Sequence, residues 1–100
     1  MAIRHIVLFQ LAATDEATRE EHAAEAKRRL EALVGVVPDL LDLTVSRNVA
    51  YEGSNFDIVL ESHFPDVAAL EAYQVHPAHV ETASFIGTIR SGRAAIDFEV

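Results

Sequence analysis

The segment that most constrains the fold is residues 3–11, which is apolar on both of its faces. Alternate side chains of an extended strand point to opposite faces. One face carries Ile3, His5, Val7, Phe9 and Leu11, and the other carries Ile6 and Leu8. A strand of this kind must be covered on both sides. The chain therefore needs helices on one face of its sheet and a further layer on the other.

The spacing of apolar residues predicts the elements that follow this strand. Thr14 or Asp15 begins a helix of about twenty residues that ends at Gly35. The buried stripe of this helix, spaced by three and four residues, consists of His22, Ala26, Leu30, Leu33, Val34 and Val37. Further strands are expected over residues 40–49, 56–64 and 94–100.

Two short helices are expected between the third and fourth strands. Asp66 caps the first helix, in which Val67, Leu70 and Tyr73 recur at core-facing positions. Pro77 begins the second helix, so His76 lies at the junction and His79 lies one turn further on.

The resulting order, β-α-β-β-α-β, is typical of an α+β antiparallel sheet with its helices on one face. A chain of 100 residues has no further helix to cover the second face of the first strand. We therefore expect a homodimer in which the sheets of two subunits pack against each other.

Composition excludes several classes of protein. A formal charge of −8 argues against a nucleic-acid partner, because phosphate contacts need clustered Lys and Arg. No apolar run approaches the ~20 residues of a membrane span, and the first residues do not resemble a signal peptide. The chain has no cysteine, which excludes disulfides and Cys-based metal sites. We expect one cytoplasmic domain over residues 1–100, without a membrane partner.

The polar chemistry of the chain is concentrated at residues 73–79, which hold Tyr73, His76 and His79. Imidazole and phenol groups can move protons or hold a ligand oxygen. His79 is predicted to act as a general base, and Tyr73 to donate a hydrogen bond to a substrate carbonyl. Each also has a structural alternative, a histidine that binds backbone at a helix start and an amphipathic core tyrosine. His76 is expected to be a junction residue.

His5 interrupts an otherwise apolar strand, and a buried imidazole needs a hydrogen-bond partner. We expect that partner to be Tyr73, His79 or a backbone carbonyl. His5 would then orient the base or the substrate, or would be a satisfied core histidine. His22, on the buried stripe of the long helix, is expected to lie by the same cavity.

A metal site is the main competing interpretation of these histidines. His5, His76 and His79 together would supply three imidazoles, as some zinc sites require. The His-Pro-x-His spacing, however, lacks the i, i+4 alignment of zinc-binding helices. We expect no metal and no cofactor, with weak Mg²⁺ binding by carboxylates left open. Nucleophilic catalysis has no support, because the chain has no Cys and no G-x-S-x-G motif.

The chain resembles the stress-responsive A/B barrel domain family of dimeric α+β barrels. The resemblance covers essentially the whole length and rests on residues 3–9, Phe56-Asp57, Phe64 with Leu70, Tyr73, residues 76–79 and Asp97-Phe98. It implies ferredoxin-like subunits whose two sheets face each other in a homodimer.

A minority of the family resembles plant polyketide cyclases, which close a linear β-polyketo thioester by an internal aldol reaction. These lyases use a histidine on the first strand, and a tyrosine and a histidine around the His-Pro segment. The resemblance implies these roles for His5, Tyr73 and His79. Phe9, Leu30, His22 and His76 are expected to line or support the pocket. The long helix departs from the cyclase pattern, since it offers Leu30, Ala26 and His22 and no aromatic side chain.

We therefore expect a cofactor-free enzyme that performs acid–base chemistry, such as polyketide-type cyclisation or isomerisation, on a small carbonyl compound. One alternative is a non-catalytic dimer that serves in stress tolerance or binds a small ligand. Another is an enzyme similar to the cofactor-independent monooxygenases. A cavity of about 300 Å³ or more beside His79 favours an enzyme or a binder, and a filled core excludes both.

Overall fold

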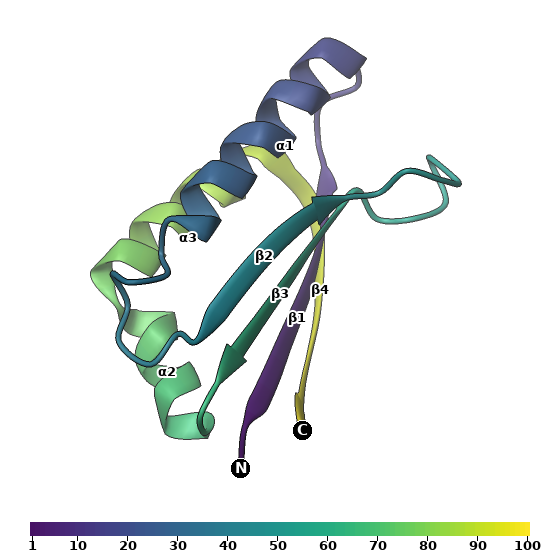
Figure 1. The fold of residues 1–100 in the computed structure, drawn as a ribbon. Coiled ribbons are helices and arrows are strands. Elements are labelled where there is room, and N and C mark those ends of the chain that lie inside the picture. Colours follow the sequence, from purple (N-terminus) through teal and green to yellow (C-terminus); the bar gives the residue numbers. More distant parts are fainter.

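The computed structural model describes residues 1–100 as one four-stranded sheet and three helices. The elements are β1 (Ile3–Leu11), α1 (Glu16–Glu31), β2 (Asp42–Arg47), β3 (Ile58–Phe64), α2 (Val67–Val75), α3 (Pro77–Ile89) and β4 (Arg90–Glu99). The sheet has the order β2-β3-β1-β4, and each neighbouring pair is antiparallel. All three helices lie on one face of the sheet (Figure 1). The predicted ferredoxin-like α+β fold is confirmed.

The inner strand β1 supplies the core with its helix-facing side chains. Ile3, Val7, Phe9 and Leu11 are buried there, and His5 is buried among them. Ile6 and Leu8 point to the opposite face, where they are half-buried. In the register of β1 and β4, Ile6 lies opposite Ile96.

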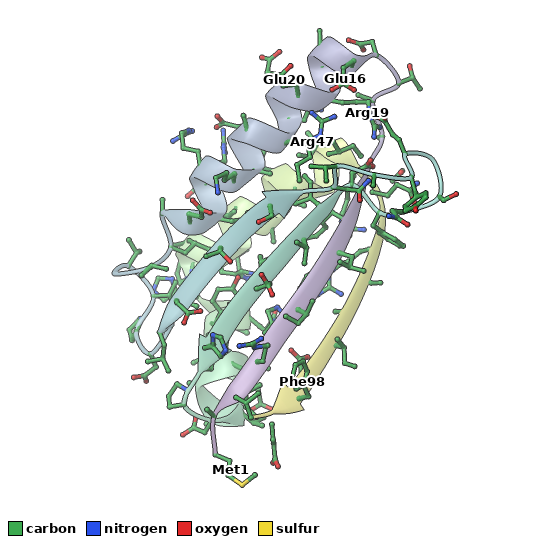
Figure 2. All side chains as sticks on the ribbon, turned by 45° about the vertical axis from the view of Figure 1, so that its right-hand side comes forward. Met1, Glu16, Arg19, Glu20, Arg47 and Phe98 are labelled. Atoms are coloured by element: carbon green, nitrogen blue, oxygen red, sulfur yellow. The ribbon has the colours of Figure 1, made fainter.

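The face of the sheet without helices carries an apolar strip along β1 and β4, formed by Ile6, Leu8, Ile96 and Phe98. Ile96 is 60% exposed and Phe98 is 41% exposed. Figure 2 looks onto this face, with Phe98 near the C-terminal end of β4. The two apolar faces predicted for the first strand are therefore present, and only one of them is covered within the chain.

Helix α1 is shorter than the sequence predicted. Asp15 caps it by accepting a hydrogen bond from the backbone N–H of Thr18 at 2.9 Å. The helix ends at Glu31, before the predicted end at Gly35, which lies in a turn at φ +87°. Val34 is 42% exposed, so its assignment to the buried helical stripe is wrong. Leu33 and Val37 are buried as predicted although they also lie beyond the end of the helix.

The second and third strands are also shorter than expected. Leu41 precedes β2 and is exposed, so it does not share the buried face of Leu43 and Val45. Asp57 precedes β3 and is buried, where its carboxylate accepts a hydrogen bond from the backbone N–H of Leu11 at 2.7 Å.

The two short helices form largely as the sequence predicted. Asp66 caps α2 by accepting from the backbone N–H of Ala69 at 2.8 Å. His76 ends α2 and caps α3, and Pro77 is the first residue of α3. Val67 is exposed, contrary to its predicted core position, because the buried residues of α2 are Ala69, Leu70 and Tyr73. None of the helices has both the length and the apolar character that crossing a membrane requires.

Candidate functional site

A cavity of about 360 Å³ lies between the sheet and the helices, next to His79. Its lining comes from every helix and from three strands: His5, Val7, Phe9, Leu30, Leu60, Tyr73, Gln74, His79, Ala83, Ile86, Arg90 and Arg93. The volume lies in the range of ~300–1,000 Å³ that small-molecule sites occupy. The core is therefore open at the place where the sequence predicted a pocket.

His5 is buried at the base of the cavity, and its partner is a carboxylate. The Nδ1 atom of His5 is hydrogen-bonded to Oδ1 of Asp97. The two residues lie opposite each other in the register of β1 and β4, and opposed residues of an antiparallel pair project to the same face. The sequence-based expectation of Tyr73, His79 or a backbone carbonyl as the partner is wrong. A carboxylate only accepts, so Nδ1 of His5 carries a proton.

Tyr73 is the central residue of the site and is only 1% exposed. Its ring centroid lies 4.2 Å from that of His79, 5.0 Å from that of Phe64 and 6.1 Å from that of His5. Tyr73 lines the cavity, and its hydroxyl group forms no hydrogen bond within the chain. Burial raises the pKa of Tyr73 to about 12. The phenol therefore stays protonated near neutral pH and is free to donate a hydrogen bond to a ligand.

His79 packs against the ring of Tyr73 and is half-buried. Its Nδ1 atom is 3.1 Å from the backbone oxygen of Gln74, and a carbonyl oxygen only accepts, so Nδ1 is the donor. Burial lowers the pKa of His79 below its ordinary value of 6.5; the Gln74 hydrogen bond opposes this effect, and the charge of Arg93 adds to it. His79 is therefore neutral near pH 7, with the lone pair of Nε2 available.

The folded chain thus brings His5, Tyr73 and His79 from three separate elements to one cavity. Each imidazole has Nδ1 occupied by an acceptor, which fixes its tautomer. The phenol in the same cavity is a donor without a protein partner. The site can therefore accept a proton at Nε2 of His79 while the phenol holds a ligand oxygen.

Only two of the four residues expected to line or support the pocket lie at the cavity. Phe9 and Leu30 line the cavity as expected, whereas His22 and His76 do not. His22 lies eight residues before Leu30 on α1, which is about 12 Å along the helix axis, and its buried Nδ1 atom has no hydrogen-bond partner. His76 is engaged elsewhere, since its Nδ1 accepts from the backbone N–H of Ala78 at 3.1 Å. It fixes the start of the helix that carries His79.

Sequence reasoning missed Asp97, Arg90 and Arg93. Asp97 lies between Ile96 and Phe98 in the alternating pattern of the last strand, so a carboxylate on the helix-facing side was available as a signal. Its pairing with His5 depends on the register of two strands that are far apart in the sequence. The two arginines were overlooked because β4 begins at Arg90, directly after α3, and not at residue 94.

Metal binding finds no support in the arrangement of the side chains. No three His, Asp or Glu residues converge in a way that would hold a metal ion. His76 and His79 are each bonded to backbone through Nδ1, and His5 is bonded to Asp97.

Comparison with known proteins identifies the family. A model of the stress-responsive A/B barrel domain matches residues 3–100. The chain belongs to this family. No match to this A/B barrel protein was found among the curated proteins.

Solved structures agree with this assignment. A dimeric protein of unknown function from Bacteroides fragilis is 26% identical, with a TM-score of 0.89 over 99% of this chain and 96% of that chain. A dimeric ferredoxin-like protein from Thermobifida fusca is also 26% identical, with a TM-score of 0.81 over 100% and 92% of the two chains. A hydroxynitrile lyase from Passiflora edulis shares the fold at 14% identity, with a TM-score of 0.77 over 99% and 93%.

Proposed function

We propose that this A/B barrel protein is a homodimeric enzyme that performs acid–base chemistry on a carbonyl-containing small molecule in the cavity. One observation carries the proposal. Two imidazoles that are each bonded to an acceptor through Nδ1, and a buried phenol that has no protein partner, line one cavity of about 360 Å³. A site that served only to fill the core would not leave the phenol unpaired and the space open.

In the proposed reaction, Nε2 of His79 takes a proton from the carbon next to the substrate carbonyl. The C–H electron pair becomes the enolate, and the hydroxyl group of Tyr73 donates a hydrogen bond to the oxygen on which negative charge develops. Isomerisation follows if the proton returns to a different carbon. Aldol cyclisation follows if the enolate carbon attacks a second carbonyl of the same molecule, as in the polyketide cyclases that the family includes.

His5 has a positioning role in this scheme. Asp97 holds its ring through Nδ1, so that His5 orients the ligand beside Tyr73. The alkoxide that an aldol step produces takes back the proton that Nε2 of His79 accepted from carbon, so the proton balance closes on His79. The name of the Passiflora edulis neighbour shows that a protein with this fold can be a lyase.

The homodimer is supported by the apolar strip of Ile6, Leu8, Ile96 and Phe98 on the sheet face without helices. Both 26%-identical neighbours are described as dimeric. A second copy packed on this strip would cover the remaining face of β1 and leave the cavity on the opposite side of the sheet accessible.

The test is deuterium incorporation next to a carbonyl group, followed by proton NMR in D₂O. The probes are a panel of stable ketones, keto acids and β-keto thioesters. We expect at least one probe to exchange faster with the protein than in buffer, and His79→Asn to slow this exchange by about 10²–10⁴-fold. His22→Asn is the matched control, because His22 does not line the cavity, and it should exchange at the wild-type rate.

Two results would contradict the proposed activity. Exchange at the buffer rate for every probe would leave the site without acid–base function. Equal rates in wild type and His79→Asn would remove His79 from the mechanism. A probe that shifts the NMR signals of His79 without exchanging would instead support the non-catalytic ligand-binding dimer, which the same cavity also favours.

A further inference from the structure

Two arginines are the only residues with a fixed charge among those that line the cavity. Arg90 and Arg93 are among its twelve lining residues, and none of the twelve is Asp or Glu. The chain as a whole has 16 acidic and 8 basic residues and a formal charge of −8. The lining of the cavity is thus positive in a protein that is otherwise strongly negative.

These two arginines are also the only basic side chains without a partner. The other six basic residues each form a hydrogen bond or an ion pair with a side chain of the protein: Arg4, Arg19, Lys27, Arg28, Arg29 and Arg47. No hydrogen bond or ion pair involves the side chain of Arg90 or Arg93. Both guanidinium groups are therefore available to an anion from outside the chain.

The backbone places the pair at one end of the site. Arg93 lies opposite Phe9 in the register of β4 and β1, and Phe9 also lines the cavity. Asp97, which holds His5, lies four residues further along β4, at roughly 13 Å. Both arginines are exposed, so the pair lies where the cavity meets solvent, whereas His5 lies deeper.

Arg93 also lies near the reactive groups. Burial is the largest influence on both rings, since it raises the pKa of Tyr73 and lowers the pKa of His79. The positive charge of Arg93 lowers the pKa of both residues in addition. A ligand that contacts this guanidinium group in the cavity therefore shares that cavity with Tyr73 and His79.

We infer that the ligand of this site is a keto acid, whose carboxylate is bound by Arg93 and Arg90 while its carbonyl oxygen faces Tyr73. A guanidinium group matches a carboxylate because two parallel N–H groups meet its two oxygens. The apolar part of the ligand would contact Val7, Leu60 and Ile86, which also line the cavity. This inference rests on the proposed function for the identity of the carbonyl end, but binding of the carboxylate does not require catalysis.

The experiment compares 3-benzoylpropionate with its neutral amide, 3-benzoylpropionamide, on the full chain. Dissociation constants are measured by NMR titration at low ionic strength. We expect the keto acid to bind about five- to tenfold more tightly than the amide, because the arginines are exposed and each contact is modest. The difference should shrink when NaCl is added.

Arg93→Gln should remove most of the preference for the keto acid and leave the affinity for the amide unchanged. Arg28→Gln is the matched control, because it changes the net charge equally at an exposed position on α1. Equal binding of the two probes would overturn the inference, as would no binding of either. The same loss in Arg28→Gln would also overturn it, by showing only a long-range effect of net charge.

Two further comparisons separate this inference from the proposed activity. Inorganic phosphate that shifts the signals of the cavity as strongly as the keto acid would overturn the ligand class, because the carbonyl half would then contribute nothing. A preference for the keto acid without deuterium exchange would support the anion site and count against the proposed enzyme. Equal exchange of the acid and the amide would support the enzyme and overturn the keto-acid inference.

Discussion

Replacing Tyr73 by Phe separates the functional role of this residue from its structural role. Phe retains the aromatic ring, so the packing against Phe64 and His79 at centroid distances of 5.0 and 4.2 Å is preserved. Only the hydroxyl group is removed, and it has no hydrogen-bond partner within the chain. The change therefore tests a single atom at the centre of the site.

The magnitude follows from this geometry. Removing an unpaired polar atom from a residue that is 1% exposed leaves no group without its partner. The free energy of unfolding should change by less than about 1 kcal/mol, and 1 kcal/mol corresponds to roughly 4–8 °C in the melting temperature of a domain this size. The deuterium-exchange rate should fall by about 10²–10³-fold, as expected for the loss of a donor to developing negative charge.

The assay combines thermal denaturation by circular dichroism with the exchange measurement, at one fixed protein concentration because a dimer melts in a concentration-dependent way. Tyr51→Phe is the control, since Tyr51 is exposed and lies away from the cavity. A clear decrease in the melting temperature of Tyr73→Phe would refute the reasoning, because it would show that the hydroxyl group has a structural partner. An unchanged exchange rate would refute its catalytic role.

Three further predictions concern the dimer, the titrating groups and the buried carboxylate. Leu8→Asp places a charge in the apolar strip, so light scattering should give the 11.0 kDa chain mass, whereas the wild type should give twice that mass; a variant that stays dimeric would contradict the sheet-to-sheet arrangement. Burial lowers the pKa of His79, so the contribution of the neutral His79 ring to stability is present above pH 6.5 and is lost as the pH falls. The deuterium-exchange rate should likewise fall at acid pH with a midpoint below 6.5. A midpoint above 6.5 would exclude His79 as the base. Asp57→Ala removes the acceptor of the Leu11 N–H and the partner of the half-buried Arg19. The free energy of unfolding, measured by chemical denaturation, should fall by about 3–5 kcal/mol. The control Glu16→Gln, at an exposed ion pair, should lower it by less than about 1 kcal/mol.

The fold could be predicted because its signals are local. Alternation in residues 3–11, the cap at Asp66 and the proline at residue 77 each act within a few residues, and all three are confirmed. The residues at which helices and strands end were harder to predict. Val34 continues the apolar spacing of α1 but lies in a turn after the helix has ended at Glu31, since helical spacing alone does not show where the hydrogen-bonded turns stop.

The site could be predicted only in part, because its chemistry is visible in the sequence and its contacts are not. His5, Tyr73 and His79 were selected as residues that can move or donate protons, and the structure brings them to one cavity. Their catalytic roles stay predictions. The partner of His5 is Asp97, 92 residues away, and this contact depends on which residue of β4 lies opposite it. Neither composition nor periodicity determines that register.

The most direct test of the account is whether His5 and His79 respond together to one ligand. Long-range ¹H–¹⁵N NMR resolves the tautomers of all five histidines while 3-benzoylpropionate is added at neutral pH. We predict that both rings carry the proton on Nδ1 before addition and that the Nε2 signals of both rings shift with the same dissociation constant. The signals of His22, His63 and His76, which do not line the cavity, should stay in place. Different dissociation constants for His5 and His79, or shifts confined to the other three histidines, would contradict a shared site.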